Sequence, residues 1–261
     1  MSSALFSVTP RDEAVASLRI ATDDDPYLGP SWADGFASAI HELGGNGSLR
    51  AVVLEGADRH FSAGATRDAL ADASARGALP EYAGRAARAL LDLPVPTIAA
   101  ARGHAVGGGL LLALWCDAVV LADESLYGAN FMQLGLTPGM GATHVIPQAF
   151  GEPLGRELLY SGRMLTGREI QEARCPLSHA VRPRGEVLER ALALAREIAE
   201  APREAIVLLK RNVASRRRER LERALRTEDA AHRRLFEHPA LAEEIARRYP
   251  AGPTPERGDV S

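Results

Sequence analysis

Short apolar runs alternate with amphipathic segments along the first half of the chain. Residues 50–54, 97–101 and 118–122 have the continuous apolar pattern of buried strands. Between them, residues 32–43 and 83–93 place apolar side chains at helical spacing, and a glycine pair or a proline-rich turn follows each segment. Strands that alternate with helices predict an α/β core with parallel strand pairing.

The pattern changes from Gly185 onward, where helical periodicity dominates. Residues 187–200 form an amphipathic helix that Pro202 ends, and residues 204–244 predict one or two further helices. The last stretch is rich in Pro, Gly and polar residues, which is typical of a disordered tail. We predict a core at residues 1–185, a C-terminal helical subdomain at 186–249 and a disordered tail at 250–261.

The composition is that of an ordinary globular protein. Of the 261 residues, 46% are hydrophobic and 25% are charged, and the net charge of -3 gives no general argument for nucleic acid. Two cysteines do not make a disulfide framework. The N-terminus shows no secretory signal pattern, and the longest apolar run, residues 110–116, is too short to span a bilayer. We expect a cytoplasmic protein with no membrane or nucleic-acid partner.

Two glycine-rich turns are the strongest chemical signal. Residues 60–65 read His-Phe-Ser-Ala-Gly-Ala, and residues 102–111 read Arg-Gly-His-Ala-Val-Gly-Gly-Gly-Leu-Leu. Glycines such as Gly64 and Gly107 allow the backbone to approach a ligand closely. The second turn opens a helix, whose first N–H groups favour negative charge. The alternative is that these glycines serve only strand–helix packing.

Together with residues 127–132 (Tyr-Gly-Ala-Asn-Phe-Met) and 135–143 (Gly-Leu-Thr-Pro-Gly-Met-Gly-Ala-Thr), these turns resemble the crotonase (enoyl-CoA hydratase/isomerase) superfamily over residues 15–245. The resemblance implies an α/β fold with a crotonase-like ββα spiral core, and a homotrimer. It also implies an oxyanion hole in which the N–H groups of Ala65 and Gly108 hold a thioester oxygen. Two such donors at a forming enolate can contribute about 3–4 kcal/mol each.

The two glutamates of the family's hydratases are missing. Their places hold Leu111 and Phe131, which cannot orient water or deliver a proton. Asp68, Asp72 and Glu81 in the loop after the first turn are the alternative acids. An apolar wall removes repulsion against a substrate carboxylate, so decarboxylation suits this site better than hydration. We expect Leu111 and Phe131 to contact the substrate.

Residues 130–132, residues 137–143 and a late His-x-x-x-Phe pattern that begins at His232 sharpen the resemblance. They are similar to the decarboxylases of polyketide β-branching cassettes, which act on 3-methylglutaconyl thioesters carried on an acyl carrier protein. This implies His232 as the proton donor; the alternative is a solvated helix histidine. Some members of that branch have a lysine where this chain has Ala73. Tyr82 is a further candidate substrate contact, with a surface tyrosine as the alternative.

The resemblance implies no cofactor apart from the phosphopantetheine arm of an acyl carrier protein or CoA that bears the substrate, and no metal, flavin or nicotinamide motif is visible. The C-terminal helices are rich in basic residues, which fits a solvated face with i,i+4 pairs or a docking surface for an acidic carrier. These residues are Arg203, Lys210, Arg211, Arg216, Arg217, Arg218, Arg220, Arg223 and Arg226.

Decarboxylation of an acyl thioester is the favoured hypothesis. A double-bond isomerase that uses the same oxyanion hole and histidine is the second, and a non-catalytic scaffold that binds an acyl carrier is the third. A hydratase comes last, because it needs an acid that the sequence does not provide at Leu111 or Phe131.

Overall fold

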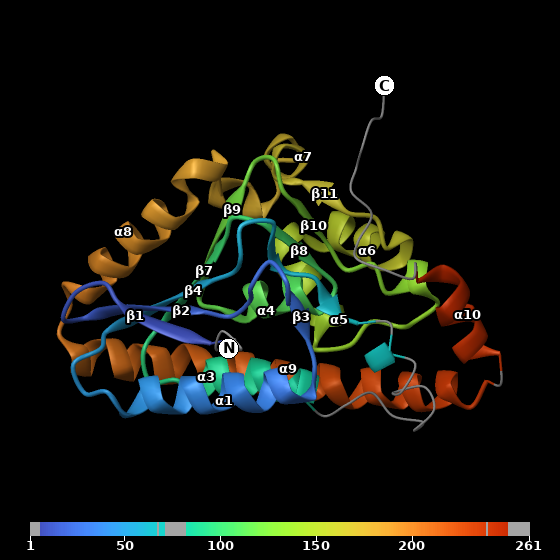
Figure 1. Ribbon diagram of the computed structural model, residues 1–261, viewed down its shortest axis with the longest axis horizontal. Coiled ribbons are helices and arrows are strands. Elements are labelled where there is room, and N and C mark those ends of the chain that lie inside the picture. Colours follow the sequence, from blue (N-terminus) through green and yellow to red (C-terminus); the bar gives the residue numbers. More distant parts are fainter. Residues whose placement is uncertain (1–5, 67, 71–81, 239, 250–261) are drawn as a thin grey trace.

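The computed structural model describes residues 6–66, 68–70, 82–238 and 240–249, and two sheets form its centre (Figure 1). The larger sheet has the order β1 (Ser7–Pro10), β2 (Val15–Arg19), β4 (Ala51–Glu55), β7 (Thr97–Ala101), β9 (Ala118–Ala122) and β12 (Val181–Arg182). Only the β1–β2 pair of this sheet is antiparallel among the described strands. The predicted α/β core with parallel pairing is therefore confirmed.

The smaller sheet brings the two glycine-rich turns together. Its order is β11 (Leu165–Thr166), β10 (Leu126–Gly128), β8 (His104–Val106) and β5 (His60–Ser62). A short parallel pair of β3 (Tyr27–Leu28) and β6 (Gly64–Ala65) continues from β5. Because β5 pairs with β8 in parallel, the turns that follow these two strands lie at the same end of the sheet.

Nine α-helices surround the sheets in the described part of the chain: α1 (Pro30–Gly45), α3 (Tyr82–Asp92), α4 (Gly108–Trp115), α5 (Ala142–Phe150), α6 (Glu152–Ser161), α7 (Gly167–Glu172), α8 (Val187–Ala199), α9 (Arg203–Phe236) and α10 (Leu241–Arg248). Three 3₁₀ turns join them, η1 (Met132–Leu134), η2 (Pro176–Ala180) and η3 (Arg184–Glu186). The helix that the second glycine-rich turn opens is α4, and all of its residues are buried.

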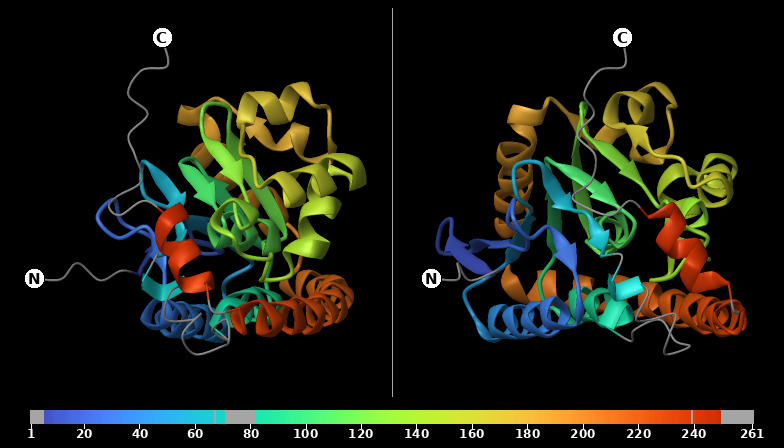
Figure 2. Two further views of the ribbon diagram at one scale, coloured as in Figure 1. Left: turned by 90° about the vertical axis from the view of Figure 1, so that its right-hand side faces the viewer. Right: turned by 45° about the vertical axis from the view of Figure 1, so that its right-hand side comes forward.

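Two hydrophobic layers hold these elements. The main core lies around α4 and includes Phe36, Phe61 and Trp115. A second cluster joins α8 to the larger sheet, where Val187 packs with Ile98. The helices α1, α3 and α9 run side by side along one edge of the molecule, and α10 turns back from the end of α9 toward the sheets (Figures 1 and 2). The predicted tail at 250–261 lies outside the described residues.

Buried ion pairs anchor α9, whose basic sequence fits a solvated face or a docking surface. Lys210 is only 3% exposed. Its Nζ donates to the carbonyl oxygen of Leu90 at 3.0 Å and to Oδ2 of Asp117 at 2.6 Å. Arg217 donates to the other carboxylate oxygen of Asp117 at 3.2 Å. Part of the basic sequence of α9 therefore serves internal packing.

No helix in the described ranges is both long and apolar enough to cross a membrane. Cys116 is buried, Cys175 is partly buried, and both are free thiols.

Candidate active site

The first glycine-rich turn packs directly against the second. Gly64 has a φ of 78°, in the left-handed region that favours glycine. A Cβ at this position would lie 2.7 Å from the carbonyl oxygen of Val106 and 3.3 Å from the nitrogen of Gly108. The two predicted halves of the oxyanion hole, Ala65 and Gly108, therefore belong to turns that touch at Gly64.

Gly107 determines the backbone orientation of the second glycine-rich turn. Its φ of 55° and ψ of -123° lie outside the regions open to L side chains, and it occupies the N-cap of α4. The Gly107 N–H donates to the carbonyl oxygen of Gly128 at 2.8 Å. Gly108 is the first residue of α4, where N–H groups have no partner inside the helix. Because α4 is wholly buried, this N–H lies in a medium of low polarity, where an electrostatic interaction is stronger than in water.

Apolar side chains occupy the places of the hydratase acids. Leu111 points into the main core and has no exposed surface. Phe131 is half-buried and contacts both the main core and a small cluster formed by Leu136, Ile245 and their neighbours. Neither position offers a group that could activate water. Their role as substrate contacts stays a prediction.

Helix α10 packs near Ala65, in the first glycine-rich turn. Leu241 and Ile245 of this helix are buried in the small cluster, and Ala65 packs against it. The hydroxyl of Tyr249 donates to the carbonyl oxygen of Ala65 at 2.9 Å. Burial raises the pKa of Tyr249 to about 12, so the phenol stays protonated and can donate. Sequence reasoning missed Tyr249, because nothing in the sequence shows where the last helix folds back.

His232 is buried rather than solvated. It is 1% exposed, and its ring stacks on Phe236 with a centroid distance of 5.9 Å. The Nε2 atom lies 2.8 Å from the carbonyl oxygen of Thr137, and since a carbonyl can only accept, Nε2 carries the hydrogen. The Nδ1 atom is buried and has no hydrogen-bond partner among the described residues. Burial lowers the pKa of His232, and the Thr137 carbonyl and Asp229 act in the opposite direction.

The loop that carries Thr137 connects His232 with the second glycine-rich turn. A Cβ on Gly108 would lie 3.1 Å from Sδ of Met140, so the Met140 side chain rests on this glycine. Phe236, the stacking partner of His232, belongs to the same apolar cluster as Ala65. The structure thus places His232 and both glycine-rich turns around one loop and one small cluster.

The other candidates are less well placed or lie outside the described part. Asp68 is exposed, and Asp72, Ala73, Glu81 and the side chain of Tyr82 lie outside the described residues. The rings of His60 and His104 contact each other edge to face at 5.5 Å, at the paired positions of β5 and β8. His41, His179 and His238 are exposed.

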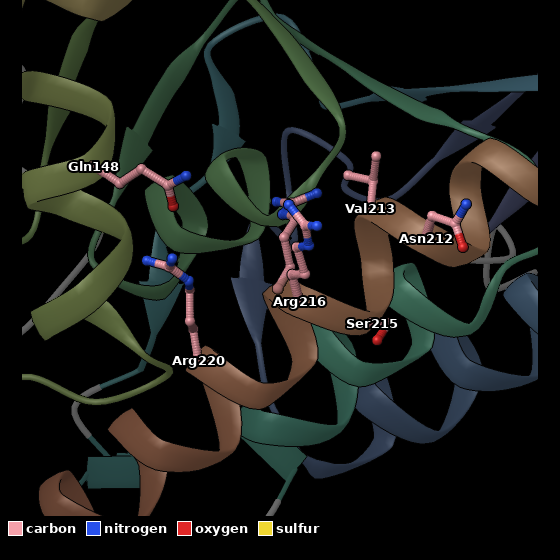
Figure 3. Close-up of a pocket in the computed structure, with 7 residues that line it drawn as sticks. Gln148, Asn212, Val213, Ser215, Arg216 and Arg220 are labelled. Atoms are coloured by element: carbon pink, nitrogen blue, oxygen red, sulfur yellow. The ribbon is translucent and has the colours of Figure 1, made fainter.

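A separate basic hollow of about 680 Å³ lies between α5 and α9 (Figure 3). Figure 3 shows Arg220 projecting from α9 toward Gln148 of α5, with Arg216 beside it on the same helix. Both arginines are exposed, and Val213 beside them is 43% exposed. The hollow contains no residue of the glycine-rich turns.

Comparisons with the sequences of known proteins show the family of this chain. The family model described as enoyl-CoA hydratase/isomerase matches residues 26–249. The chain is 36% identical over 217 residues to the bacillaene synthase decarboxylase PksI of Bacillus subtilis, covering 83% of this chain and 86% of that protein. It is 35% identical over 180 residues to a putative enoyl-CoA hydratase of Thermus thermophilus, covering 66% and 69% of the two chains.

Solved structures of similar proteins share the fold of this chain. The ECH2 decarboxylase domain of CurF from Lyngbya majuscula superposes with a TM-score of 0.86 at 30% identity, over 95% of this chain and all of that one. A protein from a dehydratase/decarboxylase enzyme couple involved in polyketide β-branching superposes with a TM-score of 0.84 at 30% identity, over 94% and 98% of the two chains.

Proposed function

The chain belongs to the enoyl-CoA hydratase/isomerase family, and we propose that it is a lyase that decarboxylates a 3-methylglutaconyl-type acyl thioester in polyketide β-branching. Its likeness to PksI and to the CurF domain, both decarboxylases, supports this activity. One observation carries the proposal: the two glycine-rich turns of the predicted oxyanion hole are in contact, whereas apolar side chains stand at Leu111 and Phe131, the places of the two acids.

The reaction that suits this site moves negative charge toward the thioester. As the carbon–carboxylate bond breaks, CO2 leaves and the bonding electrons pass through the conjugated chain to the thioester oxygen, which forms a dienolate. In this proposal the N–H groups of Ala65 and Gly108 donate to that oxygen, and one such donor is worth about 10²–10³ in kcat. An uncharged wall places no repulsion on the substrate carboxylate.

His232 returns a proton to carbon in this proposal. Its Nε2–H is held by Thr137, so Nδ1 must take up a proton before it can give one. A substrate carboxylate bound nearby raises the pKa of the imidazole, which favours protonation of Nδ1. Loss of CO2 then moves that charge from the carboxylate into the dienolate, whose carbon takes the proton from Nδ1 and leaves the imidazole neutral. No cofactor enters this scheme, apart from the pantetheine arm that bears the substrate.

We further propose an acyl carrier protein as the partner that delivers the thioester, with CoA as the alternative carrier. Arg216 and Arg220 offer exposed positive charge at the hollow between α5 and α9, which suits acidic side chains or a phosphate. The homotrimer and the cytoplasmic location also remain proposals. Leu208 and Leu209, 51% and 65% exposed on α9, are an apolar surface that self-association would cover.

Charge reversal separates these two uses of α9. The double variant Arg216→Glu/Arg220→Glu should raise KM for a carrier-bound substrate and leave KM for a short pantetheine thioester unchanged. A change of oligomeric state in sedimentation, with KM for the carrier unchanged, would instead assign this surface to self-association.

The proposed activity is tested by intact-mass spectrometry of a carrier protein loaded with 3-methylglutaconate. The proposal expects loss of the mass of CO2 with the wild-type enzyme and a large drop in rate with His232→Ala. A decarboxylase should leave a substrate without the distal carboxylate unchanged, whereas an isomerase would still move the double bond of that substrate. A gain of water would establish a hydratase, and no chemistry with a carrier that nonetheless binds would favour a scaffold.

A further inference from the structure

Glu228 and His232 lie one turn apart on α9 and are both buried, at 4% and 1% exposure. Residues four apart on a helix share a face, so both side chains point toward the same neighbour. That neighbour is the segment from Thr137 to Thr143, which precedes and begins α5.

Glu228 caps α5 from outside that helix. The N-cap residue of α5 is Gly141, which has no side chain to accept from the first turn. Instead, Oε2 of Glu228 accepts from the N–H of Gly141 at 2.7 Å, and Oε1 accepts from the N–H and the hydroxyl of Thr143 at 2.9 Å and 2.7 Å. Burial raises the pKa of this carboxyl, and the three donors oppose that shift.

In the segment from Thr137 to Thr143, the end that Glu228 caps determines where the end at Thr137 lies. Met140 has a φ of 58° and Gly141 a φ of 76°, so two successive residues adopt the left-handed conformation. The indole Nε1 of Trp115 donates to the carbonyl oxygen of Met140 at 2.8 Å. Left-handed backbone at Met140, which is not a glycine, persists only where surrounding contacts enforce it. Glu228 and Trp115 supply such contacts within the described structure.

We propose that Glu228 is a positioning residue for His232, a role that rests on the proposed function of His232 as proton donor. By holding Gly141 and Thr143, Glu228 keeps the Thr137 carbonyl where it accepts the Nε2–H of His232. That hydrogen bond selects one tautomer and leaves Nδ1 as the nitrogen that takes up and returns the proton. The same helix therefore carries the reacting imidazole and the carboxylate that fixes its tautomer.

A purely structural cap is the alternative, and matched variants separate the two. Glu228→Gln keeps the size of the side chain, but its amide nitrogen would face a donor at Gly141 or Thr143. Glu222→Gln is the control. Glu222 lies on α9, the helix that also carries Glu228, and forms a two-point ion pair with Arg88 of α3 instead of with the loop. Both variants weaken the attachment of α9, and only the first disturbs the loop that binds His232.

The experiment combines steady-state kinetics with nitrogen-15 NMR of the histidine side chains, in which His232→Gln assigns the His232 signals. We expect wild-type His232 to show the Nε2–H tautomer. Glu228→Gln should shift it toward a tautomer mixture and lower kcat about 10- to 100-fold, the range seen when an outer-shell partner is lost, with KM nearly unchanged. Glu222→Gln should leave both readouts as in the wild type.

Three results would overturn the proposal: an Nδ1–H tautomer in the wild type, unchanged His232 signals in Glu228→Gln, or equal losses of kcat in both variants. If Glu228→Gln does not fold, Thr143→Val replaces it, since it removes one donor to Glu228 and should shift the tautomer in the same direction. The NMR readout needs no turnover. A wild-type enzyme that lacks decarboxylase activity but shows the Glu228-dependent tautomer would refute the proposed function alone.

Discussion

Gly107→Ala isolates the backbone geometry of the oxyanion turn. A Cβ on Gly107 would meet only Oδ1 of Asn130, at 3.5 Å, which is an ordinary contact. The substitution therefore introduces no collision. Its cost comes from the φ of 55° and ψ of -123°, which an L residue does not adopt without strain.

The size of the effect follows from that strain. Holding a non-glycine residue in such a region costs about 1–3 kcal/mol. For a chain of this size each kcal/mol lowers Tm by about 2–4 °C. The peptide between Gly107 and Gly108 can relieve the strain by rotating, which turns the Gly108 N–H away from the thioester oxygen. Loss of one oxyanion donor lowers kcat by about 10²–10³.

The assay measures single-turnover CO2 release together with Tm. Gly185→Ala is the control, because a Cβ there meets nothing within 4 Å and its backbone lies outside the left-handed region. We expect the control to match the wild type in both measurements. Wild-type turnover in Gly107→Ala, with Tm lowered, would show that the orientation of the Gly108 N–H has no part in the chemistry.

Three further predictions concern the surroundings of the site. Tyr249→Phe removes the donor to the Ala65 carbonyl and should lower unfolding free energy by about 0.5–1.5 kcal/mol, with a fall in kcat; unchanged urea denaturation and kinetics would argue against this contact. Lys210→Met should cost about 3 kcal/mol, the lower end for breaking a buried pair, because Asp117 keeps Arg217; a urea midpoint equal to that of the wild type would contradict the prediction. Because burial holds the pKa of His232 below 6.5, the unfolded chain binds this proton more readily, so stability should fall as the pH drops below 6.5, by at most about 1.4 kcal/mol per pH unit for this group. His232→Gln should flatten the decline of Tm with pH, and an unchanged decline would count against the assignment.

The sequence predicted the features that local backbone chemistry determines. The strands at 97–101 and 118–122 have the bounds expected from their apolar runs. The glycine-rich turns can be recognised in the sequence because Gly64 and Gly107 need conformations that other residues avoid. The family resemblance followed from these turns together with residues 127–132 and 135–143. Its decarboxylase branch followed from residues 130–132, residues 137–143 and the His-x-x-x-Phe pattern that begins at His232.

The features that the sequence did not predict depend on which way a long helix faces. Lys210 and Glu228 occur among solvated charges on α9, and their burial follows from the position of Asp117 and of the first turn of α5. His232 could not be distinguished from a surface histidine for the same reason. Tyr249 reaches Ala65 only because α10 folds back, which no local pattern encodes.

The most direct test of the central claim is to run the reaction in D2O and record the mass of the carrier-bound product. The account predicts that the product loses CO2 and gains one carbon-bound deuterium, and that His232→Gln slows this conversion. An intact carboxylate after prolonged incubation, with deuterium exchanged into the chain, would show an isomerase and contradict decarboxylation by the Ala65–Gly108 oxyanion hole.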